Sequence, residues 1–137
     1  MCTVTPVASL IELVKLWPRL LKCAKADTPC LNSEWFLRGL LRSLASGAVF
    51  VVRADSGVIG CCAVEQTAND SLILHTIPND KGTGTAKACL EAIKEYAEEV
   101  GCTDVMVTTR NFSGSSFRYF KHALGFRQYS VTFNLKV

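Results

Sequence analysis

The sequence predicts an α/β fold, in which a mixed, mostly antiparallel sheet is flanked by helices. Three patterns lead to this fold class. Apolar and β-branched runs between residues 48 and 77 are separated by turn residues, as in three consecutive antiparallel strands. Residues 86–101 then repeat apolar side chains at helical spacing. Residues 128–137 alternate apolar and polar side chains, as in a half-buried strand.

Two helices are expected before these strands. Thr5 and Pro6 form a good helix start, because a capping hydroxyl precedes a proline at the first helical position. Pro18 is expected to end or kink this helix, which Leu20 and Leu21 could continue. The residues predicted to face inward at helical spacing are Val7, Leu10, Val14 and Trp17.

A second helix is predicted from Glu34 to about Ser46. Asn32 or Ser33 can cap its start, and Gly47 is predicted to end it. The period of the apolar residues changes from helical to strand-like directly after this glycine, so the sheet follows at once.

Turn residues separate the three predicted strands at 48–53, 58–66 and 71–77. The Asp55-Ser56-Gly57 turn joins the first two strands into a hairpin, and Asn69-Asp70 turns the chain into the third. A further short strand near residues 2–4 could precede the first helix.

The clearest predicted helix covers residues 86–100 and is ended by Gly101. A short β-branched strand is expected at 104–109, and another helix at 113–124 is ended by Gly125. The inward face of the first of these helices would consist of Ala86, Cys89, Leu90, Ile93, Ala97 and Val100. In the final strand, one face would consist of Tyr129, Val131, Phe133, Leu135 and Val137.

The size and composition favour one compact domain over residues 1–137. Hydrophobic residues make up 49% of the chain, which argues against disorder of the whole chain. The net charge of +3 is too weak to indicate binding to nucleic acid, and no block of Lys and Arg occurs.

The cysteines and the termini of the sequence favour the cytoplasm. No apolar run is long enough to span a membrane, and the first six residues lack the basic region of a secretory signal. The seven cysteines are odd in number, and Cys61, Cys62 and Cys89 occur in apolar patterns, as buried thiols do in a reducing compartment. No Cys-x-x-Cys occurs, so no metal site is expected.

A strand, a glycine-containing loop and a helix start fall together at residues 71–90. The first amides of a helix lack a carbonyl partner within the helix and carry partial positive charge, so they suit a phosphate. Gly82 and Gly84 have no side chain, which lets a pyrophosphate approach the backbone. The first turn contains no acidic residue, so the positive end of the helix suits an external anion.

A simpler interpretation of this loop stays open: it connects a strand to a helix and binds nothing, and Asp80 could cap the helix itself. The loop is neither a Walker loop nor the Gly-x-Gly-x-x-Gly motif of dinucleotide-binding proteins.

Residues 78–86 resemble the acetyl-CoA-binding signature of the GNAT superfamily of N-acetyltransferases, Arg/Gln-x-x-Gly-x-Gly/Ala, after a strand-ending proline. The resemblance places Lys81 at the Arg/Gln position, Gly84 at the glycine and Ala86 at the last position. The late helix, which ends in Leu124-Gly125-Phe126, is similar to the family's late helix. Together with the final strand and the two early helices, these motifs resemble small family members from bacteria or bacteriophages.

In the GNAT family, the fourth and fifth strands splay apart, and the pantetheine arm of acetyl-CoA hydrogen-bonds to the fourth strand. The resemblance implies pantetheine contacts from Leu74, His75, Thr76 and Ile77. It implies pyrophosphate contacts from Lys81, Gly82, Thr83, Gly84, Thr85 and Ala86. Asn111 and the late helix, including Phe120, would flank the cysteamine end.

Two positions depart from the family pattern. Lys81 replaces Arg or Gln, and an ammonium lacks the fork of a guanidinium, but most phosphate contacts in the family come from the backbone. The family's late helix carries a tyrosine that can protonate the leaving thiolate. Here Phe120 is nearest to that slot, and Tyr119 is turned about 100° from it around the helix. Tyr119 is therefore a candidate acid, or else a half-buried aromatic residue.

Glu65 and His75 are the candidate general bases. Glu65 could accept a proton directly or through water, or it could be a solvated carboxylate near the end of the hairpin. His75 lies on the strand that would line the cleft, and histidine exchanges protons readily near neutral pH. A packed, hydrogen-bonded strand histidine is the alternative.

The sequence therefore predicts an acetyl-CoA-dependent N-acetyltransferase, in which a primary amine attacks the thioester directly and no metal takes part. The acceptor stays open among small amines, antibiotics, protein lysines and N-termini. The alternative is a non-catalytic protein of this fold with a structural or partner-binding role, for example in a phage virion. A phage-encoded protein would work in the host cytoplasm or in the virion. Family members often dimerise, so a homodimer is also open.

Overall fold

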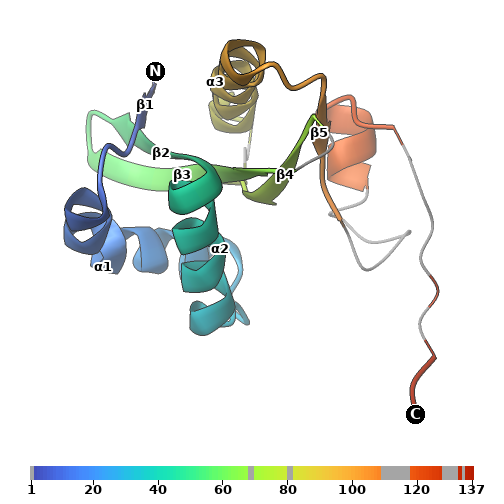
Figure 1. Ribbon diagram of the computed structural model, residues 1–137. Coiled ribbons are helices and arrows are strands. Elements are labelled where there is room, and N and C mark those ends of the chain that lie inside the picture. Colours follow the sequence, from blue (N-terminus) through green and yellow to red (C-terminus); the bar gives the residue numbers. More distant parts are fainter. Residues whose placement is uncertain (1, 68–69, 80–81, 109–117, 128–132, 134) are drawn as a thin grey trace. The chain divides into compact units, whose positions relative to one another are not determined.

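The computed structural model describes all residues except 1, 68–69, 80–81, 109–117, 128–132 and 134 (Figure 1). The chain divides into two compact units, Met1–Val107 and Thr108–Val137. In the first unit, the described residues form a five-stranded sheet in the order β1-β2-β3-β4-β5. Its strands are β1 (Thr3–Pro6), β2 (Gly47–Ala54), β3 (Gly57–Gln66), β4 (Ser71–Thr76) and β5 (Asp104–Met106).

The sheet is mixed, as predicted. Neighbouring strands from β1 to β4 pair antiparallel, whereas β4 and β5 pair in parallel. The chain crosses from β4 to β5 through a helix, as parallel pairing requires. The helices of this unit are α1 (Leu10–Asp27), α2 (Ser33–Ser46) and α3 (Thr85–Val100).

The three helices cover the two faces of the sheet. Helices α1 and α2 both contact β3, and α2 also contacts β2 and β4, whereas α3 contacts β1 and β2. Figure 1 shows α1 and α2 on one side of the sheet and α3 on the other. The predicted α/β class with a sheet flanked by helices is therefore confirmed.

The core between the sheet and the two early helices comes from alternate strand residues. Val49 and Val51 of β2 lie opposite Ala63 and Cys61 of β3, and all four are buried against the helices. The helical members of this core are Leu13, Leu16, Leu20, Phe36 and Leu40.

Helix α1 begins later than predicted. Thr5 and Pro6 belong to the edge strand β1, and the amide of Val7 extends the pairing by donating to the carbonyl of Val49 (2.7 Å). An edge strand tolerates proline, because one side of it needs no donor. The helix is instead capped by Ser9, whose hydroxyl accepts from the amide of Glu12, while the Glu12 carboxylate accepts from the amide of Ala8. The sequence contains this Ser-x-x-Glu pattern, which is typical of a helix start, and here Glu12 bonds to the amide before the cap.

The predicted inward face of α1 is also wrong, because it was derived from a helix that begins at Pro6 rather than at Leu10. Leu10 and Val14 are 54% and 63% exposed, and the buried positions are Leu13, Leu16 and Leu20. Trp17 is partly buried and stacks on Phe36, with ring centroids 5.7 Å apart.

Pro18 lies inside α1 and does not end it. A proline leaves the carbonyl four residues earlier without its helical donor, here that of Val14. Because the Val14 side of the helix is exposed, water can hydrogen-bond to that carbonyl.

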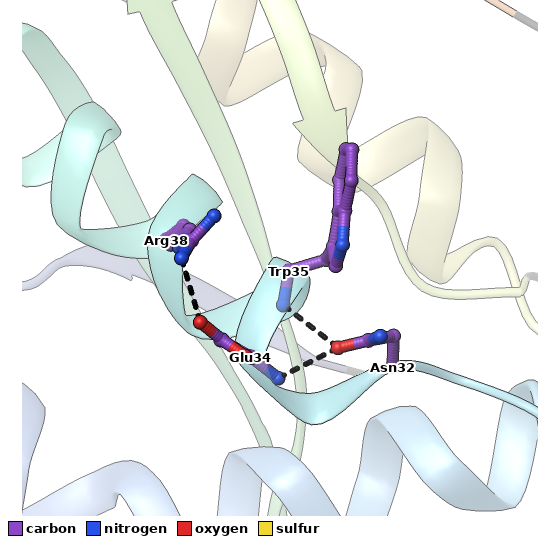
Figure 2. A network of polar contacts seen from close by, with 4 residues as sticks. All are labelled: Asn32, Glu34, Trp35 and Arg38. Carbon is purple, nitrogen blue, oxygen red and sulfur yellow. Dashed lines mark hydrogen bonds and ion pairs between the residues drawn. The ribbon is translucent and has the colours of Figure 1, made fainter.

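Helix α2 begins at the predicted cap. The Asn32 side-chain oxygen accepts from the amides of Glu34 (3.0 Å) and Trp35 (3.1 Å), as Figure 2 shows. One turn on, Glu34 forms an ion pair with Arg38 (2.6 Å) on the solvent side.

Gly47 ends α2 as predicted, but its backbone is not left-handed. The residue is already the first of β2, opposite Glu65 of β3. A Cβ at Gly47 would overlap the carbonyl oxygen of Val64, so glycine is required by close approach of the two strands.

Helix α3 and its end agree with the prediction. Gly101 has a φ of 77° and closes the helix by donating to the carbonyls of Ala97 and Glu98. Strand β5 ends at Met106, earlier than predicted, and Thr109 lies outside the described residues.

In the second unit, the described part of the predicted late helix is a π-helical turn, η1 (Tyr119–Ala123). Gly125 ends it with a φ of 77°, as expected. Residues 113–117 lie outside the described part of the chain. The final strand is not found where the structure describes it, because Phe133 and residues 135–137 are not in a strand. Alternation defines an apolar face, but a strand also needs a hydrogen-bonded neighbour.

Replacing Leu40 by Ala should lower the free energy of unfolding by about 2–5 kcal/mol, because its side chain is fully buried between α2 and the sheet. The matched control is Leu41→Ala, one position along the same helix, where the side chain is 40% exposed and the loss should stay below about 1 kcal/mol. Urea unfolding followed by circular dichroism measures both. Equal losses would contradict this assignment of the core.

Candidate functional site

The candidate site begins where β4 leaves its neighbour. Among the described residues, only Ser71, Leu72 and Ile73 of β4 have register partners on β5, and β5 ends at Met106. We call residues 74–76 the open end of β4. Backbone groups on this side of a strand are available to an extended ligand, which can add to the edge like another strand.

A β-bulge lies in the open end of β4. Val64 of β3 pairs with Leu74 and Ala63 pairs with Thr76, so His75 is the extra residue on β4. A bulge bends the strand and re-aims the side chain at that position. When all its atoms are counted, His75 is an exposed residue. Its side chain alone is only 23% exposed, so much of the exposed area belongs to its backbone.

The other predicted pantetheine contacts lie around the bulge. Leu74 is buried, Thr76 is half-buried, and Ile77 is half-buried just after the end of β4. Pro78 is buried and lies against Gly60 of β3, where a Cβ would come within 3.2 Å of the proline ring. The packing of Pro78 against Gly60 therefore holds the chain in place just after β4, where the loop begins.

The loop that follows has two glycines in the left-handed conformation. Gly82 and Gly84 have φ values of 78° and 79°. A side chain is strained at such angles, which explains glycine at both positions. A Cβ at either glycine would meet no described atom within 4 Å, so both glycines border space that the described residues leave open.

Helix α3 starts directly after this loop. Gly84 is its N-cap and supplies no side-chain hydrogen bond, and the first turn contains no acidic residue. Thr85 and Ala86 are buried, and the Thr85 hydroxyl lies 2.7 Å from that of Thr83. The positive end of the helix dipole thus lies beside two glycines with open space around them.

Glu65 and His75, predicted separately, lie together. The Glu65 Oε1 atom is 2.7 Å from the His75 Nε2 atom, and their side chains are 27% and 23% exposed. Glu65 is therefore a half-buried, hydrogen-bonded carboxylate, and His75 is a hydrogen-bonded strand histidine, as one of the two alternatives for it predicted.

Helix α2 contributes Gly39, which the sequence analysis did not identify. A Cβ at this position would contact the His75 side chain, at 3.5 Å from Cβ and Cγ and 3.6 Å from Nδ1. A glycine inside a helix lowers the stability of the helix by about 1 kcal/mol relative to alanine. A glycine within the predicted helix could therefore have indicated that another side chain packs closely against the helix at that position.

The remaining predicted site residues lie outside the described residues or in the second unit. Lys81 and Asn111 lie outside the described residues, as does Asp80, the alternative helix cap. Tyr119 and Phe120 belong to the second unit. There, the Phe120 ring packs against Tyr119 and Phe126, with centroid distances of 5.8 Å and 5.4 Å.

A groove of about 530 Å³ lies elsewhere in the first unit, between β1, β2 and α3. Its lining includes the Phe50 and Tyr96 rings, which meet edge to face, together with Glu95 and Glu99. Partial burial, with smaller effects of Cys102 and Glu99, raises the pKa of Tyr96. Two carboxylates repel an anionic ligand, so the groove is a poor alternative to the α3 start for binding a phosphate.

No protein-family model and no curated protein sequence matches the chain. Solved structures do match it over nearly its whole length. The aminoglycoside N-acetyltransferase AAC(6')-Iy, in complex with a CoA bisubstrate analogue, has 20% identity and a TM-score of 0.69, with 100% of this chain and 99% of that chain covered. The chain has the GNAT acetyltransferase fold.

Two further structures with this GNAT fold come from different bacteria. The IAA acetyltransferase from Bacillus cereus has 20% identity and a TM-score of 0.70, with 95% of this chain and 79% of that chain covered. The ribosomal-protein-S18-alanine N-acetyltransferase from Escherichia coli has 16% identity and a TM-score of 0.64, with 95% and 80% covered. The fold expected from the motifs is thus confirmed.

The cysteines of this GNAT-fold chain are all free thiols. Burial, and then the neighbouring Cys89 and Cys23 thiols, raise the pKa of Cys61 to about 12. The hydrogen bond with Cys89, and then burial, raise the pKa of Cys62. Thiols held in the protonated form are poor nucleophiles, so neither side chain suits covalent catalysis. Among the described residues, no group of His, Cys, Asp and Glu could hold a metal ion.

Iodoacetamide at pH 8 should therefore modify the exposed Cys30 of the native protein at least about 100-fold faster than the buried Cys61 and Cys62. Peptide mapping by mass spectrometry after timed quenching measures the three rates. In urea the rates should become similar. Rapid native labelling of Cys61 would contradict its assignment as a buried, protonated thiol.

Proposed function

We propose that the protein is an acetyl-CoA-dependent N-acetyltransferase that acts on a primary amine. The observation that carries this proposal is the junction of β4 and α3. The open end of β4 leads within a few residues to two left-handed glycines and to a helix start without acidic residues. Within a GNAT fold, this junction suits a long ligand with an amide-containing arm and a pyrophosphate.

The comparisons support the choice of ligand. The AAC(6')-Iy structures are complexes with CoA and with a CoA-linked bisubstrate analogue. In this chain, the open space at Gly82 and Gly84 is what the approach of a pyrophosphate to the backbone requires. Acetyl-CoA would supply the acetyl group as a thioester.

The proposal assigns roles to the predicted residues. Leu74, His75, Thr76 and Ile77 would bind the pantetheine arm through their backbone. The pyrophosphate would be held by Lys81, Gly82, Thr83, Gly84, Thr85 and Ala86. Asn111 and Phe120 would flank the cysteamine end. The residues proposed for the pantetheine arm, the pyrophosphate and the cysteamine end would belong to one domain over residues 1–137.

An amine acceptor follows from the same comparisons. Several of the matched proteins are named for transfer to aminoglycosides, and one for transfer to an alanine of a ribosomal protein, and these substrates offer amino groups. We propose an amine acceptor for this chain. Its class can be determined by measuring acetylation of a panel that contains aminoglycosides, alkylamines and peptides with free N-termini.

The setting of the reaction is also a proposal. The seven free cysteines fit a reducing compartment, so we place the protein in the cytoplasm of a bacterium or of a phage-infected host. None of the helices in the described part of the chain has the length and apolar character of a membrane span. A homodimer is the assembly that we would test by light scattering.

Replacing Gly84 by Val should abolish CoA binding, because the side chain would fill the space beside the first turn of α3. The matched control is Gly57→Val in the β2–β3 turn, where φ is also positive (111°) and a Cβ also meets no atom within 4 Å. Isothermal titration with acetyl-CoA and with CoA should give saturable one-to-one binding for the wild type and the control only. Full affinity in folded Gly84→Val would show that the loop assignment is wrong. A wild type that binds neither ligand would favour a non-catalytic protein.

Replacing Tyr119 by Phe should lower turnover by roughly 10- to 1,000-fold with little change in CoA affinity, because the variant lacks the hydroxyl that would protonate the leaving thiolate. Tyr96→Phe, at the groove beside β1, removes a hydroxyl elsewhere and should leave turnover unchanged. Release of CoA, followed with a thiol reagent, reports the rates. Equal turnover in the two variants would remove Tyr119 from the mechanism.

A further inference from the structure

The sheet has a bare edge at β1, and a groove lies beside that edge. Among the described residues, β1 pairs only with β2, so its other side carries unpaired backbone groups. The groove of about 530 Å³ between β1, β2 and α3 has an apolar floor, to which Val4, Pro6 and Phe50 contribute. Val4 is half-buried and Pro6 is exposed, so α3 leaves this part of the sheet incompletely covered.

The wall of this groove on α3 is acidic. Glu95 and Glu99 lie one turn apart, both are exposed, and neither forms an ion pair with a described residue. Like charges at this spacing repel each other. They also lie near the negative end of the α3 dipole, and the last turn contains no basic residue. A cation brought to the groove would therefore stabilise this end of α3.

Helix α1 carries a surface of the opposite kind. Leu10 and Val14, one turn apart, are 54% and 63% exposed, and Ile11 beside them is 70% exposed. Lys15 and Arg19 follow Ile11 at intervals of four residues, so these three side chains form one exposed row along the helix. Neither cation forms an ion pair with a described residue. The start of α1 thus presents apolar side chains next to basic ones.

The two surfaces match but cannot meet within one copy of the chain. Helices α1 and α3 lie on opposite sides of the sheet (Figure 1). A two-fold rotation about an axis along the free edge of β1 exchanges these sides, so it brings α1 of a second copy next to the groove. The same rotation brings α1 of the first copy next to the groove of the second, so the contact is made twice. The four-residue spacing of the two cations equals that of the two groove carboxylates.

We propose that this surface is the interface of a homodimer, in which α1 of each copy covers the groove of the other. The exposed apolar side chains at the start of α1 pack on the groove floor, and Lys15 and Arg19 pair with Glu95 and Glu99. Burial of the apolar side chains supplies most of the affinity, and the charges fix how the two copies are oriented. The proposal does not depend on the proposed function, because the interface contains none of the residues assigned to acetyl-CoA.

Sedimentation velocity over a concentration series measures the dissociation constant of the dimer. Ile11→Glu should raise this constant by about 30-fold or more, because it places a carboxylate against the apolar floor and the acidic wall. The matched control is Trp35→Glu on α2, where a similarly exposed apolar side chain (67%) lies outside the interface. A wild type that stays monomeric at about 100 μM would overturn the proposal, as would equal dissociation constants for the two variants.

An exchange of charges gives a test that a loss of folding cannot imitate. The double variant Glu95→Lys/Glu99→Lys sets positive against positive at both contacts, and Lys15→Glu/Arg19→Glu sets negative against negative. Each variant alone should be monomeric at concentrations where the wild type dimerises. An equimolar mixture restores opposite charges at both contacts, so it should form a heterodimer with an affinity within about tenfold of the wild type. A mixture that stays monomeric, or single variants that dimerise like the wild type, would show that the two copies do not meet at this surface.

Discussion

In the described part of the chain, strand β4 pairs with β3 from Leu72 to Thr76, apart from the bulge at His75, but with β5 only from Ser71 to Ile73. The rest of the candidate site depends on this unequal pairing. Up to Ile73 the strand is an interior strand of the sheet, and beyond it no described residue pairs with it on the β5 side. Edges are usually protected against other strands by charge, bulges or covering segments. Here the bulge at His75 and the buried Pro78 limit the edge to a few residues, which is enough for a narrow ligand and too short for another sheet.

The two faces of the sheet carry different parts of the candidate site. On one face lies α3, which follows β4 in the sequence and presents the positive end of its dipole with no acidic residue in its first turn. On the other face, α2 lies over Glu65 and His75.

The sequence predicted the layers well, because they depend on periodicity. Strands β2, β3 and β4 and helices α2 and α3 appear where apolar spacing and glycine signals placed them. The start of α1 was wrong because two local signals competed. The Thr5-Pro6 pair resembled a helix cap, but pairing with β2 determines its conformation. The helix begins after Ser9, whose side chain accepts a hydrogen bond from the amide of Glu12.

The site was less predictable, for a physical reason. Gly82 and Gly84 were found because a left-handed backbone leaves a mark in the sequence, namely glycine. The Glu65–His75 contact joins residues ten positions apart through a strand register, and the bulge that sets this register has no clear sequence signal. The contact between Gly39 and His75 depends on which residue of β4 lies beneath α2, and this is known only once the strand register is known.

Gly47 has a consequence for how this chain can change during evolution. It is at once the end of α2, the start of β2 and the residue opposite Glu65, so no connecting segment separates helix from sheet. Length changes are tolerated where loops absorb them. Residues 28–32 between α1 and α2 form such a loop, whereas one residue inserted at Gly47 would rotate α2 or shift the β2 register. Diversity in relatives of this chain should therefore collect before α2, and the junction after it should keep its length.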